Sequence, residues 1–154
     1  MDHAPTPVPA TATAGWIVLN GLRGSGKSTL AQRLAERRGV AAVDLDVRVR
    51  RRFGGRTIAE IWRSDGEPAF RAAEAEAVSE VLAEPPGVLA LGGGTAMVPA
   101  AAARLARAIE AERACVIYLR TSPERLAARL AADRVSGASG ASGASAAADR
   151  PPLQ

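Results

Sequence analysis

The sequence predicts a single α/β domain in which a parallel β-sheet lies between two layers of helices. Short apolar segments at residues 16–19, 40–45, 88–91 and 115–119 alternate with segments that have apolar residues at helical spacing. Parallel neighbouring strands need helical crossovers, so this alternation favours a three-layer α/β/α arrangement. With 154 residues, the chain is long enough for one such domain and too short for two.

The first apolar segment is followed by a glycine-rich turn and then by a helix over residues 28–38. This helix ends at Gly39, a residue typical of helix C-caps. The second apolar segment, residues 40–45, predicts a strand with acidic residues at its end. We expect Asp44 and Asp46 at the carboxyl edge of this strand.

The alternation continues through the rest of the chain. Thr57-Ile58-Ala59-Glu60 is a capping box, in which the hydroxyl and the carboxylate bind each other's backbone amides, and it begins a helix through Trp62. Pro68 begins a longer helix that runs to about Leu82, because proline is favoured in a first helical turn. The remaining elements are a strand at 88–91 that runs into Gly92-Gly93-Gly94, a helix over about 100–111, a strand at 115–119 and a helix from Ser122 to about 132.

The composition excludes several classes of site. Lys27 is the only lysine among twenty basic residues, and the single histidine and cysteine are His3 and Cys115. These counts disfavour a histidine-based triad, a disulfide framework and a zinc cluster. The formal net charge of +4 comes from arginines spread along the chain, and aromatic residues make up only 3%. We therefore expect no nucleic-acid partner.

The two ends of the chain have unusual compositions. Residues 1–15 contain several prolines and no basic or apolar signal regions, so we expect a disordered leader ahead of a domain over 16–154. Residues 136–148 repeat Ser-Gly-Ala and predict a flexible loop. No apolar run is long enough to span a membrane, and an unpaired cysteine fits the cytoplasm.

The glycine-rich turn carries the most specific motif. Gly21-Leu22-Arg23-Gly24-Ser25-Gly26-Lys27-Ser28 matches G-x-x-x-x-G-K-[ST] between a predicted strand and a predicted helix. Backbone amides of such a loop surround phosphate oxygens, the lysine reaches the β- and γ-phosphates, and the serine ligates Mg²⁺. A chance match is the alternative, and both flanks disfavour it. The expected phosphate-binding residues are Gly24, Ser25, Gly26, Lys27, Ser28 and Thr29.

Three further groups of residues are candidates for binding the molecule that accepts the phosphoryl group. Asp44 and Asp46 could serve a metal ion and an acceptor hydroxyl, or they could be surface acids in a turn. Arg71 lies three residues before Glu74 on one helical face and could bind a substrate carboxylate. A surface ion pair is an equally good interpretation of that pair. The three glycines at residues 92–94 allow a ligand to approach the backbone.

Taken in order, these motifs resemble those of the shikimate kinases, which are small P-loop kinases. The resemblance covers residues 16 to 153 and rests on the phosphate loop, D-x-D at Asp44 and Asp46, I-x-E-I-W…G-E-x-x-F-R-x-x-E from Ile58 to Glu74, L-G-G-G at Leu91 to Gly94, Y-L-x-x-S-P-E at Tyr118 to Glu124, and R-P-x-L at Arg150 to Leu153. The family implies a nucleoside-kinase-like P-loop fold with a flexible lid. It also implies ATP-dependent, Mg²⁺-supported phosphorylation of the shikimate 3-hydroxyl in aromatic amino acid biosynthesis, by a monomer acting on small molecules.

The resemblance also implies a role for each matched residue. Asp46 would bind shikimate hydroxyls as base or orienting group, Asp44 would support Mg²⁺ through water, and Arg71 would hold the shikimate carboxylate. The other implied contacts are Gly92, Gly93 and Gly94 in the same pocket, Trp62 and Phe70 as its apolar wall or as plain core residues, Arg129 on adenine, and Arg150 as a catalytic lid arginine over the phosphates.

The sequence departs from the family pattern at three places. Arg48, Arg50, Arg51 and Arg52 follow the D-x-D motif where the family has acidic residues, and residues 136–148 expand the lid. The last helix and strand of the family are absent. The alternatives are therefore an impaired ATP- or ligand-binding paralogue or fragment, and a kinase for another hydroxy acid such as gluconate.

Overall fold

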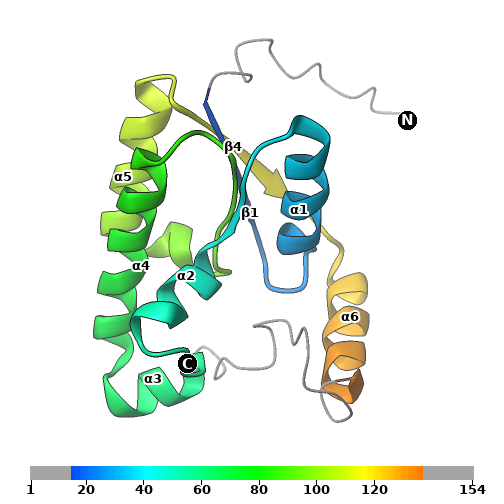
Figure 1. The fold of residues 1–154 in the computed structure, drawn as a ribbon. Helices are drawn as coiled ribbons and strands as arrows, with labels where there is room; N and C mark the ends of the chain where they lie inside the picture. The colour runs from blue at the N-terminus through cyan, green and yellow to red at the C-terminus, as the bar shows by residue number, and fades with distance from the viewer. Residues whose placement is uncertain (1–14, 137–154) are drawn as a thin grey trace, which may run out of the picture.

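The computed structural model describes residues 15–136. Its centre is a four-stranded sheet in the order β2-β3-β1-β4, in which every neighbouring pair is parallel (Figure 1). The strands are β1 (Trp16–Gly21), β2 (Ala42–Asp44), β3 (Val88–Ala90) and β4 (Ala114–Leu119). The predicted α/β class and parallel sheet are confirmed.

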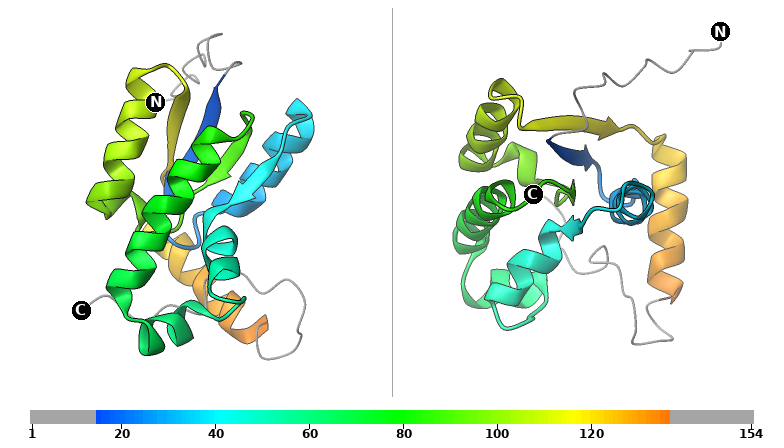
Figure 2. Two further views of the ribbon diagram at one scale, coloured as in Figure 1. Left: turned by 60° about the vertical axis from the view of Figure 1, so that its left-hand side comes forward. Right: turned by 45° about the horizontal axis from the view of Figure 1, so that its top comes forward.

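Helices cover both faces of this sheet. They are α1 (Lys27–Arg38), α2 (Leu45–Arg52), α3 (Ile58–Ser64), α4 (Glu67–Ala83), the short 3₁₀ helix η2 (Thr95–Met97), α5 (Pro99–Glu110) and α6 (Pro123–Ser136). Helix α1 lies against one face, and α4 and α5 lie against the other (Figure 2). None of the helices between residues 15 and 136 is long and apolar enough to cross a bilayer.

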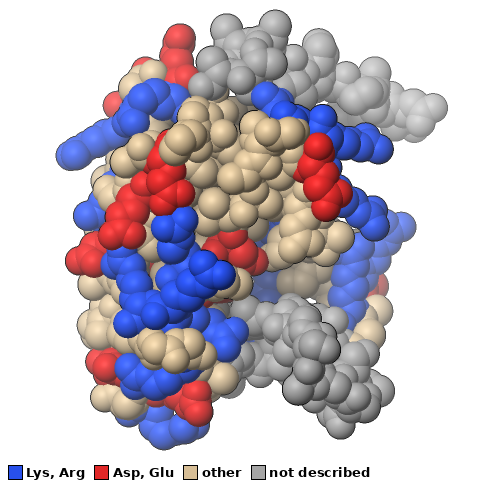
Figure 3. Space-filling view, in the orientation of Figure 1, with Lys and Arg blue, Asp and Glu red and all other residues tan. Residues whose placement is uncertain are grey.

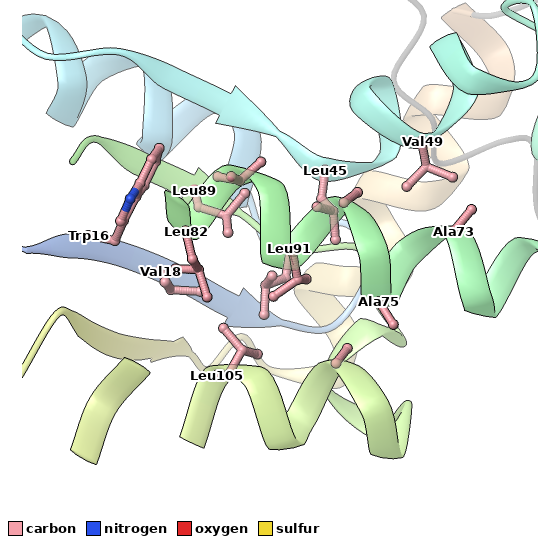
Figure 4. Close-up of a cluster of buried hydrophobic side chains, with 14 of the residues drawn as sticks. Trp16, Val18, Leu45, Val49, Ala73, Ala75, Leu82, Leu89, Leu91 and Leu105 are labelled. Atoms are coloured by element: carbon pink, nitrogen blue, oxygen red, sulfur yellow. The ribbon is translucent and has the colours of Figure 1, made fainter. Parts of the chain in front are cut away.

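The alternation of side chains along β1 produces the two halves of the core. Trp16 and Val18 belong to the larger cluster, with side chains from α2, α3, α4 and α5 (Figure 4). Ile17 and Leu19 point to the opposite face and pack with Ala31 of α1 in the smaller cluster. These four residues of β1 are each at least 96% buried, as expected for an interior strand of a parallel sheet.

The helix boundaries follow the predicted caps in most places. Thr57 accepts a hydrogen bond from the Glu60 amide at 3.2 Å, and the Glu60 carboxylate accepts from the Thr57 amide at 2.7 Å. This confirms the capping box that begins α3. Gly39 ends α1 in the left-handed conformation, as predicted.

Helix α2 and the short η2 were not predicted from the sequence. The second strand is only three residues long, and Asp44 is the N-cap of α2, where its Oδ1 accepts from the Val47 amide at 3.2 Å. Asp46 therefore lies in the first turn of a helix, and the expectation that Asp44 and Asp46 share a strand end is wrong. Asp44 has extended backbone angles and a capping side chain, which is the usual geometry for the start of a helix.

Three predictions fall outside the described residues. They concern the disordered leader before Gly15, the flexible insert after Ser136 and the lid arginine Arg150. The helix predicted to end at about Ala132 continues as α6 to Ser136.

Candidate active site

The candidate site lies where β1 and β3 end. The chain leaves β1 through α1 toward β2 and leaves β3 through α5 toward β4, so the strand order reverses between β1 and β3. Open α/β sheets bind ligands at the carboxyl ends of the strands beside such a reversal. The Leu91 amide donates to the Leu19 carbonyl at 3.0 Å, and a Cβ added to Gly93 would lie 3.4 Å from the Arg23 amide nitrogen. The phosphate loop and the glycine turn are therefore neighbours.

The phosphate loop occupies the predicted place between β1 and α1. Gly24 and Gly26 have φ angles of 77° and 92°, a left-handed conformation that a side chain would strain. Gly26 is also the N-cap of α1, and it has no side chain to occupy the free amides of the first helical turn. The N-terminus of α1 is thus suited to bind phosphate.

Lys27, the first residue of α1, lies folded against this loop. Its Nζ donates to the carbonyls of Gly21 and Leu22 at 2.8 and 2.9 Å, and the residue is only 8% exposed. These contacts hold the ammonium group at the mouth of the loop, where it can exchange a carbonyl for a phosphate oxygen.

Ser28 and Asp44 meet on the other side of the loop. The Ser28 hydroxyl donates to Asp44 Oδ2 at 2.5 Å, and both residues line a cleft of about 280 Å³ between α1, β2 and α2. Their hard oxygen atoms suit Mg²⁺, which typically binds one or two protein oxygens together with water and phosphate. Among residues 15–136, no three His, Cys, Asp or Glu side chains cluster to form a metal cage. A water-rich Mg²⁺ site at Ser28, with Asp44 behind it, fits this donor set.

The Arg71 guanidinium is fixed by two carboxylates. Its Nε and Nη2 contact Glu67 Oε1 at 3.0 and 2.9 Å, and Nη1 donates to Glu74 Oε2 at 2.8 Å. Burial by itself would lower the pKa of Arg71, but Glu74 and Glu67 raise it above its ordinary value. A guanidinium has five N–H donors. One N–H on each terminal nitrogen has no acceptor within residues 15–136, and two such donors can bind a carboxylate end-on.

Glu74 anchors Arg71 more deeply than the sequence pattern indicates. It is fully buried, and its second oxygen accepts from the buried Thr95 hydroxyl at 2.6 Å. The Arg71–Glu74 pair is therefore anchored in the core rather than at the surface. The position of Thr95 in the sequence could have indicated this contact, because a hydroxyl directly after the glycine turn can reach a neighbouring helix.

Glycine backbone and two aromatic rings surround the Arg71 guanidinium. A Cβ added to Gly94 would lie 3.2 Å from Arg71 Nη1, so the guanidinium packs where a side chain would otherwise stand. The guanidinium carbon also lies 5.4 Å from the Trp62 ring centroid and 5.9 Å from that of Phe70. The two rings contact each other edge to face at 6.2 Å. Phe70 is fully buried and Trp62 is partly buried, so they serve as core residues and as a wall beside Arg71.

Helix α6 places Arg129 over the phosphate loop. Its Nη1 donates to the Gly24 carbonyl at 3.2 Å and would lie 3.6 Å from a Cβ at Gly26. Leu126 and Leu130 of the same helix lie beside Gly24. The arginine predicted to pack on adenine is therefore at the loop, and its contact with a base remains a prediction.

A parallel sheet with a glycine-rich G-x-x-x-x-G-K-S loop between β1 and α1 defines a P-loop domain of the α/β class. The family model described as shikimate kinase matches residues 23–142, and the chain belongs to the shikimate kinase family.

Individual relatives agree with this assignment. The chain is 53% identical over 77 residues to a shikimate kinase from Thermobifida fusca, a match that covers 50% of this chain and 44% of the relative. It is 49% identical over 89 residues to one from Mycobacterium tuberculosis, covering 58% of this chain and 50% of the relative. The chain thus spans about half the length of the curated relatives it matches.

Solved structures show the same fold. A shikimate kinase from Acinetobacter baumannii in complex with shikimate superposes with a TM-score of 0.71 at 33% identity, covering 83% of this chain and 68% of that one. The crystal structure of a shikimate kinase from Bacteroides thetaiotaomicron has a TM-score of 0.68 at 28% identity, with coverages of 76% and 63%.

Proposed function

We propose that the chain transfers the γ-phosphoryl group of ATP to the 3-hydroxyl of shikimate. The observation that carries this proposal is the Arg71–Glu74–Thr95 arrangement beside the phosphate loop, because it offers a fixed carboxylate-binding group next to a phosphate-binding one. Family membership and the shikimate bound to the Acinetobacter baumannii relative favour shikimate over other hydroxy acids.

The phosphate side would hold ATP without covalent chemistry. The amides of Gly24 to Thr29 would bind the phosphates, and Lys27 would move from the carbonyls of Gly21 and Leu22 to the β- and γ-phosphate oxygens. Mg²⁺, when bound, would neutralise charge on the phosphates that develops during transfer. Ser28 would hold it directly and Asp44 would hold it through water. Arg129 and Arg150 would contact the nucleotide.

The acceptor side would orient shikimate and remove a proton. Arg71 would bind the carboxylate through its two open N–H groups, while Gly92, Gly93 and Gly94 would line the pocket. Asp46 would orient the 3-hydroxyl and accept its proton as that oxygen bonds to the γ-phosphorus. The bond from phosphorus to the β–γ bridging oxygen breaks in the same step, and ADP leaves.

A coupled assay of ADP release tests the proposal. The purified chain, with Mg·ATP and shikimate, should release ADP in an amount equal to the shikimate 3-phosphate formed. Lys27→Ala should reduce the rate at least about a hundredfold, since positioned cations contribute most to phosphoryl transfer. Arg71→Ala should raise the KM for shikimate and leave that for ATP unchanged.

Two outcomes would overturn this assignment. One is an equal rate of ADP release by the wild-type chain and by Lys27→Ala, because the phosphate loop would then not catalyse the transfer. The other is faster turnover with gluconate than with shikimate, which would move the acceptor to another hydroxy acid. We further propose that the chain acts as a monomer. We also propose that it acts in the cytoplasm, because its one cysteine, Cys115, fits a reducing compartment.

A further inference from the structure

The arginines at residues 48–52 have no role in the proposed phosphoryl transfer, and their contacts differ from one another. Arg48 makes two hydrogen bonds to the Glu84 carboxylate, at 2.8 and 3.1 Å. Arg52 contacts Glu76 at 2.7 Å and also pairs with Glu80. Both arginines therefore reach from α2 to carboxylates on α4 or at its C-cap.

The other two arginines of this segment do not contact α4. Arg50 donates to the carbonyls of Arg56 and Gly55 at 3.0 and 3.3 Å, which ties the end of α2 to the loop that follows. Arg51 is exposed and has no hydrogen bond or ion pair within the described part of the chain. The segment thus contains two arginines that bind α4 and one of equal charge that does not.

The spacing of these charges matches two helices lying side by side. Glu76, Glu80 and Glu84 are four residues apart, so they form one row along α4. Arg48 and Arg52 are also four apart and form the facing row on α2. In Figure 3, basic side chains over α2 lie next to acidic side chains over α4. We name these five residues the α2–α4 ion ladder.

Helix α2 is held on α4 by a small apolar contact and by these ion pairs. It has only eight residues, and only Leu45 and Val49 are buried. Isolated helices of this length are unstable in water, so packing and ion pairs must hold α2 in place. The Glu80 hydrogen bond, opposed by burial and reinforced by Glu76, raises the pKa of Arg52 above its ordinary value.

The placement of α2 matters for the acceptor site. Asp46 lies in the first turn of α2, whereas Arg71 and Glu74 lie on α4. We propose that Arg48 and Arg52 are positioning residues, which hold α2 on α4 and so fix Asp46 relative to Arg71 for the acceptor. This proposal rests on the proposed function, because it assigns Asp46 and Arg71 to one substrate.

Matched variants test the ladder. The Arg48→Gln/Arg52→Gln double variant should raise the KM for shikimate about five-fold or more and lower kcat, because Asp46 is then less well placed to accept the proton. The KM for ATP should change less than about two-fold. In hydrogen–deuterium exchange, the amides of residues 45–52 should exchange at least about five-fold faster, and those of α1 should not change. Arg51→Gln removes the same charge from the same helix and should leave the KM for shikimate and the exchange of residues 45–52 unchanged. Because Arg51 lines the cleft that contains Ser28 and Asp44, the KM for ATP is not part of this control.

A charge exchange distinguishes positioning from a general loss of stability. Arg48→Glu alone should show both defects, and Arg48→Glu/Glu84→Arg should restore the exchange rate and the KM to within about two-fold of wild type. Unchanged α2 exchange in the double variant, or an equal effect of Arg51→Gln, would overturn the ladder. A uniform rise of both KM values would overturn its role in the acceptor site. If the wild-type chain does not phosphorylate shikimate, the proposed function fails, whereas the exchange measurement still tests whether the ladder holds α2.

Discussion

Replacing Glu74 with alanine should destabilise the domain far more than replacing Glu67 with alanine, although both carboxylates bind Arg71. Glu74 is fully buried and holds two partners, Arg71 at 2.8 Å and Thr95 at 2.6 Å. Its removal leaves a guanidinium and a hydroxyl without their carboxylate. Breaking a buried ion pair by removing one partner costs about 3–5 kcal/mol, and the value here should be near 3 because Arg71 keeps Glu67.

Glu67 presents the opposite case. Its side chain is 50% exposed, and solvent-exposed ion pairs contribute about 0.2–1 kcal/mol. For a domain of this size, about 1 kcal/mol corresponds to roughly 4 °C in Tm. Glu74→Ala should therefore lower the Tm by about 12 °C and Glu67→Ala by about 2 °C, measured by calorimetry at pH 7.

Glu74→Gln separates the charge from the hydrogen bonds. The glutamine amide oxygen can accept from Arg71, and its amide N–H can donate to the Thr95 hydroxyl, so both contacts can persist. We expect a loss of only about 1 kcal/mol, together with a higher KM for shikimate because Arg71 is held less firmly. Equal Tm values for Glu74→Ala and Glu67→Ala would refute the reasoning, since burial would then have no effect on the strength of the pair.

Three further substitutions test separate features. Gly94→Ala should push the Arg71 guanidinium from its 3.2 Å contact and raise the KM for shikimate about ten-fold, with the KM for ATP unchanged in steady-state assays. Ser28→Ala should raise the Mg²⁺ concentration for half-maximal activity about ten-fold, as loss of a metal partner typically does. The Thr57 amide and hydroxyl lower the pKa of Glu60 below 4.5, so its stabilising contribution is full above that pH and is lost as the pH falls through the depressed value. Thermal scans should show a smaller acid-induced fall in Tm for Thr57→Ala than for wild type.

Features set by neighbouring residues were predictable from the sequence. The phosphate loop and the capping box of α3 each depend on contacts within a few residues, and both lie where they were predicted. Helix α2 was missed because only Leu45 and Val49 of its eight residues are buried, which leaves almost no apolar periodicity. The only local indication of this helix is Asp44 as a possible N-cap, and an aspartate at that place is equally compatible with the end of a strand.

The burial of Glu74 could not be predicted from its own helix. The i,i+3 spacing with Arg71 is the same whether the pair faces water or the core. The buried partner of Glu74 is Thr95, which is 21 residues further along the chain. Thr95 follows β3 and lies beside α4 because the sheet brings it there. A long-range contact of this kind does not change the residue pattern of a single helix. The Arg71–Glu74 spacing is therefore compatible with a surface ion pair and with a buried one.

The same reasoning explains why the two halves of the site meet. Nothing in the glycine turn at residues 92–94 specifies a neighbour, yet β3 pairs with β1 over Ile17 to Leu19, and the Leu91–Leu19 hydrogen bond continues the pairing past the strand ends. The turn must then emerge beside the phosphate loop that follows β1. The contact that β1 and β3 make between the halves is therefore a backbone contact. Asp44 is a second link, because one carboxylate oxygen accepts from Ser28 and the other accepts from the first turn of α2, where Asp46 lies. Substitutions at Lys27 and at Arg71 can still test phosphate binding and acceptor binding separately, although transfer needs both.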